Sequence, residues 1–243
     1  MAVSATAAVR PSESSGWHRF LPTTAVASLG LMVGGLVVSG LVGGIFPSPY
    51  DAPGAIADYF AQQSQAVRLQ SPFMLGSAAA LGCYAALISA RMREVGQIAW
   101  SHLSLMAGGI SAGMLALSGL LVWVLARGGE RAPVADLRTV HDLTFVTGGV
   151  CHVLFLALMI VSVSMAFGRS GLLPWPMTAV GVAIGMLGVV AVISMLVPAF
   201  TVVLPIVRFP GLLWMIIAGF LIWRRGRQST LHRTGAARTE RQG

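Results

Sequence analysis

Apolar residues run along this chain in long stretches that only short polar clusters separate. Each stretch has about 20 residues or more, which is the length an α-helix needs to cross the hydrocarbon core of a bilayer. The stretches are too long for strands and lack the strict alternation of a half-buried sheet. The sequence therefore predicts an all-α, polytopic transmembrane helix bundle with about six spans.

Prolines and arginines mark where the stretches end, as at Pro47 after the first and Arg91 after the second. Six spans are predicted, at about residues 21–46, 71–90, 98–126, 139–167, 175–197 and 203–223. Together they form a transmembrane domain over residues 21–223, preceded by a cytoplasmic segment, residues 1–20. A basic cytoplasmic tail follows at residues 224–243, and its Arg, Gln, Ser, Thr and Gly content predicts disorder.

One segment outside the spans has a helical pattern of its own. Between residues 53 and 69, apolar residues such as Ile56, Tyr59 and Phe60 recur at three- and four-residue spacing, with polar residues between them. This pattern predicts a short amphipathic helix on the outer membrane interface after the first span. A lid over an outward-facing cavity is the functional alternative.

Composition excludes an ordinary soluble domain. Of 243 residues, 56% are hydrophobic and 10% charged, whereas soluble domains carry about 25% charged residues. The net charge of +8 comes with sixteen basic residues, all of them Arg. They gather beside the last span instead of on a folded basic face with stacking aromatics, which argues against nucleic-acid binding. We expect Arg224, Arg225 and Arg227 to contact anionic lipid headgroups.

The distribution of arginine predicts the orientation. Eleven of the sixteen Arg lie in the N-terminal segment, the second and fourth loops and the tail. Basic residues near span ends favour the cytoplasm, so both termini are predicted to be cytoplasmic. The tail holds six of these eleven, and without it the two sides have five Arg each.

Glycines stand four apart inside several predicted spans, a spacing that lets helix backbones approach closely in lipid. The pairs are Gly30 and Gly34, Gly40 and Gly44, Gly109 and Gly113, and Gly181 and Gly185. Packing among the six helices explains them more simply than contacts between copies. A homo-oligomer or a larger membrane complex stays open.

Polar groups inside a membrane are costly, which makes them candidates for function. His141 and Asp142 stand at the outer end of the fourth span. If the sixth span begins near Val202, Arg208 lies inside it at a comparable depth, so that Asp142 is its expected partner and the three residues form an outer polar pocket. If the helix begins after Pro210, Arg208 is an interfacial residue.

Two further histidines, His102 and His152, fall in the third and fourth spans, about 5 Å apart in depth. They are the candidates for a haem, although a neutral His that donates to a neighbouring helix satisfies the same positions. No C-x-x-C-H motif occurs. Cys83 and Cys151 are too few for a metal site and are expected to be small core residues. We therefore predict no metal and no resident cofactor, with haem as the alternative.

The layout resembles a group of six-span integral membrane proteins of unknown function that are common in actinobacteria. The resemblance rests on an outer helix after the first span (APGAIADYFAQQ), a basic patch after the second (ARMRE), a His-Asp pair opening the fourth (VHDLTF) and a basic tail. It covers residues 21–227 and implies the six-span fold, the outer position of His141 and Asp142, and a bacterial cytoplasmic membrane. It implies no activity.

Two classes of function remain. No H-E-x-x-H or G-x-S-x-G motif occurs, and a chain without Lys has no Walker-type phosphate loop. No catalytic residues are therefore assigned, and the scarcity of catalytic groups favours a non-enzymatic protein, either a small transport or permease-like unit or an accessory subunit of a membrane assembly. The alternative is an intramembrane redox protein or enzyme that uses His102 and His152, or His141 and Asp142.

Overall fold

The computed structural model describes residues 19–44, 46–128 and 132–239, with side chains as far as Gly226. Its described residues contain six helical segments that are long and apolar enough to cross a membrane. The prediction of an all-α bundle with six spans is therefore confirmed. A seventh, short helix, α2 (Pro53–Gln62), lies between the first two.

Three of the spanning segments are single helices, and three contain a change of helix type. The single helices are α1 (Phe20–Gly43), α3 (Ser64–Glu94) and α4 (Ile98–Gly128). The fourth span joins α5 (Val134–Phe145), the π-helix η2 (Val146–Cys151) and α6 (His152–Arg169), the fifth joins α7 (Trp175–Val190) and the 3₁₀ helix η3 (Ala191–Met195), and the sixth joins η4 (Pro198–Val202) and α8 (Val203–Thr239).

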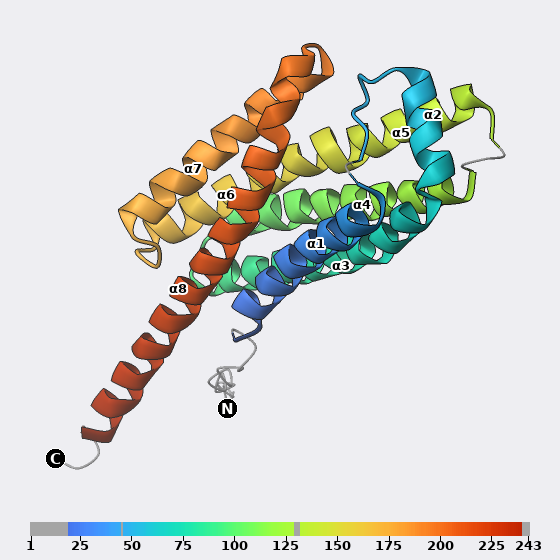
Figure 1. Cartoon of the computed structure of the whole chain (residues 1–243). Coiled ribbons are helices and arrows are strands. Elements are labelled where there is room, and N and C mark those ends of the chain that lie inside the picture. The colour runs from blue at the N-terminus through green and yellow to red at the C-terminus, as the bar shows by residue number, and fades with distance from the viewer. Residues whose placement is uncertain (1–18, 45, 129–131, 240–243) are drawn as a thin grey trace, which may run out of the picture.

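The helices pack in a bundle in which α3 contacts α1 and α4, α6 contacts α4 and α7, and α8 contacts α1, α6 and α7. The start of α1 and the far end of α8 lie at the same end of the bundle (Figure 1). At the opposite end, called the distal end below, lie the end of α1, α2, the start of α5 and the η3–η4 connection (Figure 1).

Several boundaries differ from the predicted ones. The first span was expected to reach Phe46, but α1 ends at Gly43 because Gly44 has a φ of 76°, a backbone conformation that stops a helix and that glycine adopts readily. The amphipathic helix was expected to reach residue 69. It ends at Gln62, and Ala66 and Val67 belong to α3, where both are buried.

The second span was expected to begin at about residue 71, but α3 begins at Ser64, and Pro72 lies inside it, eight residues after its start. Since proline has no N–H, the carbonyl of Arg68, four residues earlier, lacks its usual helical donor. At the other end of the chain, the segment expected to be a disordered tail continues α8 as a helix through Thr239. No proline interrupts the sequence after Arg224.

The predicted glycine pairs divide into two groups. A side chain at Gly181 or Gly185 would collide with Ser164 or Val161 of α6, so these glycines bring α7 against its neighbour. A side chain at Gly109 would meet nothing within 4 Å, and the same holds for the glycines at positions 30, 40 and 113. Close helix packing therefore explains the pair in α7 and not the pair in α4.

Buried serines link the helices through hydrogen bonds. The Ser77 hydroxyl donates to the Ser28 carbonyl at 2.8 Å, and the Ser28 hydroxyl to the Ser77 carbonyl at 3.1 Å, which joins α1 to α3. The hydroxyl of Ser71 in α3 donates to the carbonyl of Gly119 in α4 at 2.7 Å. Each bond satisfies a hydroxyl that would otherwise be unpaired in an apolar interior.

Candidate functional site: a cavity with an arginine in the distal half

His141 is 1% exposed and stands behind the loop that follows α1. Its ring stacks on Phe46, with centroids 5.5 Å apart, and contacts Phe60 of α2 edge-on at 5.7 Å. Its Nε2 lies 3.2 Å from the Pro47 carbonyl oxygen. Because a carbonyl only accepts hydrogen bonds, Nε2 carries the proton. His141 therefore fastens the loop to α5.

Tyr59 of α2 belongs to the same aromatic group, with its ring 5.9 Å from that of Phe46. Burial raises the pKa of its hydroxyl, so the hydroxyl stays protonated. Phe60 belongs to a second hydrophobic cluster, to which α1, α2, α3, α4 and α5 contribute, and Phe46 and Tyr59 pack against it.

Asp142 does not pair with Arg208 as expected. Its Oδ2 accepts a hydrogen bond from Arg138 Nε at 3.3 Å, one helical turn earlier in α5. Its Oδ1 is buried and lies 3.9 Å from His141 Nδ1, too far for a hydrogen bond. A local partner at four-residue spacing thus takes the carboxylate.

Arg138 also holds the loop. Its Nη2 donates to the Pro49 carbonyl at 2.9 Å and its Nη1 to the Asp51 carbonyl at 3.4 Å. From the same loop, the Tyr50 hydroxyl donates to the Ser194 carbonyl in η3 at 2.5 Å. The loop over residues 46–51, called the distal loop below, is therefore fastened on one side to α5 and on the other to η3.

Arg208 lies inside α8, as expected for a sixth span that begins near Val202. Its Nη2 donates to the carbonyl of Gly148 in η2. The amide of His152 donates to the carbonyls of Thr147 and Gly149, whereas in a regular α-helix it would donate to Gly148. The π-helix thus turns a backbone carbonyl toward the guanidinium.

In the described part of the chain, no carboxylate pairs with Arg208, and its buried Nε has no hydrogen-bond partner. A carbonyl oxygen carries only a partial negative charge, so the positive charge is solvated but not neutralised. A cation in this state inside a membrane span is costly.

Arg208 lines a cavity of about 290 Å³ between α1, α3, α4, η2 and α8. Its polar lining consists of Arg208, Gln70, Ser118, Thr144 and Thr201, whereas Leu36, Met74, Val122, Phe145 and Leu204 form apolar walls. Phe46 and Pro47 of the distal loop complete the lining. The distal loop therefore forms part of the cavity wall.

Ser118 and Thr144 have their hydroxyls already engaged, in bonds of 3.0 Å and 2.9 Å to the carbonyls of Thr144 and Val140. The Gln70 carbonyl oxygen accepts a hydrogen bond from Ser39 at 3.4 Å, which leaves its amide nitrogen as a donor. The cavity therefore presents a guanidinium and an amide, both of them donors.

His152 is fully buried and joins η2 and α6 to α4. The Ser111 hydroxyl donates to the His152 carbonyl at 2.9 Å, and His152 Nδ1 lies 2.9 Å from that hydroxyl and 3.1 Å from the Ser111 carbonyl oxygen. Its Nε2 is buried and has no hydrogen-bond partner.

The structure does not bring the two haem candidates together. His102 is exposed on α4, whereas His152 is buried against Ser111, nine residues further along that helix. Nine residues of helix span about 13 Å, well beyond the 5 Å expected from counting. Cys83 lies exposed on α3 and Cys151 is half-buried in η2, and the described residues include no group of three or more His, Cys, Asp or Glu able to hold a metal ion.

Sequence reasoning missed the parts of the site that depend on packing. It placed Arg138 in a loop, although the spacing between Arg138 and Asp142 is a readable signal for a helical ion pair. Gln70 and Tyr50 were assigned no role. No sequence pattern indicates that Gln70 lines the cavity or that Tyr50 connects the distal loop to η3.

The fold and the cavity define a multi-pass α-helical membrane protein with a polar site in one half of the bundle. Compared with protein-family models, curated proteins and solved structures, the chain shows no match.

Proposed function

We propose that this protein binds a small organic anion in the cavity around Arg208 and serves as a non-enzymatic membrane protein, either a permease-like unit or an accessory subunit. The observation that carries the proposal is the guanidinium of Arg208, which faces the cavity with no carboxylate partner in the described part of the chain. An anion would supply the missing charge.

The size and lining of the cavity support the class of ligand. Its volume of about 290 Å³ is at the small end of ligand sites, which occupy roughly 300–1,000 Å³. One cation and one amide donor lie among apolar walls. A short-chain carboxylate has the matching form, with an anionic head for Arg208 and Gln70 and an apolar tail for Met74 and Leu204.

The chemistry of the lining favours binding over catalysis. His141 and His152 are the nearest histidines, and neither is among the residues that line the cavity. Arg208 and the neutral polar groups orient an anion but provide no general base at the cavity surface. An intramembrane redox protein with haem between His102 and His152 has no support from this geometry.

The arrangement of charges supports an outward-facing cavity. Among the arginines whose side chains are described, six lie at the end of the bundle where α1 begins: Arg19, Arg91, Arg93, Arg169, Arg224 and Arg225. Three lie toward the distal end: Arg68, Arg127 and Arg138. By the positive-inside rule we propose that both termini are cytoplasmic, in a bacterial cytoplasmic membrane as the family resemblance implies.

Contacts with anionic headgroups at Arg224, Arg225 and Arg227 are part of the same proposal. The guanidinium of Arg224 lies over the Phe220 ring at 5.9 Å, and Arg225 donates to the Gly171 carbonyl at 2.9 Å. Both are thus held at the cytoplasmic end of the sixth span in the proposed orientation. The side chain of Arg227 lies outside the described ones. Chemical cross-linking in membranes tests separately whether the chain acts alone, as a homo-oligomer or within a larger complex.

A thermal-shift experiment on the purified full chain in mild detergent tests the anion site. Hexanoate is the probe and hexanamide its uncharged analogue. A ligand that binds only the folded state stabilises it in proportion to ln(1 + [L]/Kd), so we expect a saturable rise in melting temperature with hexanoate alone. Arg208→Gln should abolish the rise. Arg127→Gln, an exposed arginine on α4, is the matched control and should retain it.

The melting temperature of Arg208→Gln without ligand distinguishes a binding role of Arg208 from a structural one. If Arg208 is kept for an anion, the neutral variant should be as stable as the parent or more so, since a costly charge is removed. Equal shifts with hexanoate and hexanamide, or a hexanoate effect that survives in Arg208→Gln, would refute the anion site. Uptake of labelled hexanoate into proteoliposomes then distinguishes a permease from an accessory subunit.

Labelling in intact cells tests the orientation. In a Cys83→Ser, Cys151→Ser background, Asp58→Cys on the exposed face of α2 should react with a membrane-impermeant maleimide. Arg93→Cys at the other end should react only after lysis. The reverse labelling pattern would show that the bundle has the opposite orientation, with both termini outside the cell.

A further inference from the structure

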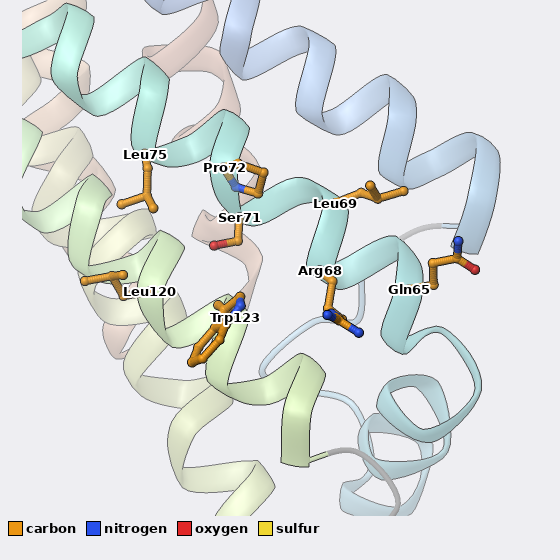
Figure 2. A pocket seen from close by; sticks show the side chains of 8 residues that line it. All are labelled: Gln65, Arg68, Leu69, Ser71, Pro72, Leu75, Leu120 and Trp123. Carbon is orange, nitrogen blue, oxygen red and sulfur yellow. The ribbon is translucent and has the colours of Figure 1, made fainter.

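A groove on the outside of the bundle, separate from the Arg208 cavity, runs between α3 and α4 toward the distal end (Figure 2). It encloses about 680 Å³. Pro72, Leu75, Leu120 and Trp123 form its apolar part, and Arg68 lies at its polar end. Figure 2 shows Leu75 and Leu120 on the two facing helices, with Arg68 and Trp123 nearer the distal end.

The floor of the groove is fixed by a close approach of the two helices. The Ser71 hydroxyl donates to the Gly119 carbonyl at 2.7 Å. A Cβ at Gly119 would lie 3.1 Å from Met74 Cβ and 3.5 Å from the Ser71 carbonyl oxygen. The groove is therefore a shaped feature of the helix pair and not a gap between mobile side chains.

The polar end of the groove lacks a counter-ion. Arg68 is exposed, and within the described residues no carboxylate pairs with it. Its own carbonyl has lost its helical donor to the ring of Pro72. A second cation, Arg127, lies over the Trp123 ring at 4.9 Å. Two cationic groups thus stand at the rim of an apolar channel.

The position of the groove in the membrane indicates which kind of molecule can bind in it. Leu120 is 50% and Trp123 43% exposed, on spanning helix α4, so both face lipid. From Arg68 to Leu75 the helix rises about 10 Å. If Arg68 lies at the level of the lipid headgroups, Leu75 lies at the level of the upper part of the acyl chains. Tryptophan and arginine at this level are the residues that anchor proteins at the membrane interface.

We propose that the groove between α3 and α4 is a binding site for an anionic glycerophospholipid of the phosphatidylglycerol type. The phosphate lies on the Arg68 guanidinium, and one acyl chain lies along Pro72, Leu75 and Leu120. This site is independent of the anion cavity, because its residues belong to the outer faces of α3 and α4.

Native mass spectrometry of the full chain in mild detergent tests the site, with phosphatidylglycerol and phosphatidylcholine as probes. We expect phosphatidylglycerol to bind the parent protein more tightly. Arg68→Gln should weaken its binding about fivefold, the effect of one arginine near a lipid surface, and leave phosphatidylcholine unchanged. Arg93→Gln, an exposed arginine at the other end of α3, is the matched control.

A second pair of variants tests the apolar part. Leu120→Trp should fill the groove and weaken the binding of both lipids, whereas Leu117→Trp, also exposed on α4 but outside the groove, should not. Equal binding of the two lipids by the parent would overturn the proposal. So would equal losses in Arg68→Gln and Arg93→Gln, since general charge attraction would then suffice.

Discussion

Two adjacent glycines on α4, Gly108 and Gly109, allow a matched test of how the bundle packs. A Cβ at Gly108 would overlap the Cβ of Ala85 in α3 and lie 2.6 Å from the Met159 sulfur in α6. A Cβ at Gly109 would meet nothing within 4 Å. The same substitution therefore has opposite consequences at neighbouring positions.

The magnitude follows from two opposing effects. Met159 is flexible and can move, but the Ala85 methyl is fixed to its backbone, so α3 and α4 must separate to admit a side chain at Gly108. Overpacking of this kind costs about 1–3 kcal/mol, and alanine returns about 0.5–1 kcal/mol of helix stability relative to glycine. We expect Gly108→Ala to lower the free energy of unfolding by about 1–2 kcal/mol and Gly109→Ala to raise it by up to about 1 kcal/mol.

Reversible unfolding with SDS in mixed micelles, followed by far-UV circular dichroism, measures both values on the purified chain. Because the two variants share chemistry, helix and depth, propensity and detergent effects cancel in their difference of about 2 kcal/mol. Equal changes in the two variants, or a larger loss for Gly109→Ala, would refute the packing of α4 against α3 and α6.

Three other substitutions test single contacts. Ser111→Ala removes the hydroxyl shared with His152 and should lower the free energy of unfolding by about 0.6–1.7 kcal/mol in the same assay; no change would mean that the pair contributes nothing. Arg138→Gln frees the distal loop and should speed amide hydrogen exchange there with little loss of global stability; unchanged exchange would contradict this anchoring. Gly148→Ala would drive a methyl into Ser118 and should cost about 1–3 kcal/mol, measured by SDS unfolding, and a neutral result would argue against the close contact of η2 with α4.

The number of spans could be predicted because it depends only on the length of apolar runs. Run length left open whether Arg208 lies inside the last helix, because the helix could begin near Val202 or after Pro210, and the structure places Arg208 inside it. Its partner could not be predicted, because counting residues gives depth along a helix and not the direction a side chain takes. Asp142 has the right depth, yet Arg138 is its neighbour one turn away and pairs with it.

The same limit explains the histidines. A helix that is apolar on all sides gives no indication of which face is buried. His102 and His152 therefore looked equivalent in the sequence, but one is exposed and the other is fully buried with Ser111 as its partner. The π-helix η2 was equally invisible, since residues 146–151 carry no proline or other mark that would predict it.

Two of the three changes of helix type, together with the distal loop, border the same cavity. η2 supplies Gly148 and Gly149 to the lining of the cavity, η4 supplies Thr201, and the distal loop supplies Phe46 and Pro47. In a bilayer, irregular backbone is stable only where protein buries it or where it lines a polar cavity.

Packing alone would be served by continuous helices, and π-helical segments occur often at functional sites. Here the carbonyl of Gly148 in the π-helix accepts a hydrogen bond from Arg208, and the 3₁₀ segment before α8 supplies Thr201 to the same cavity. Both departures therefore border the cavity of the guanidinium whose charge no described carboxylate balances. Their convergence makes the Arg208 cavity, more than the histidines or the cysteines, the place in this bundle where a ligand would be bound.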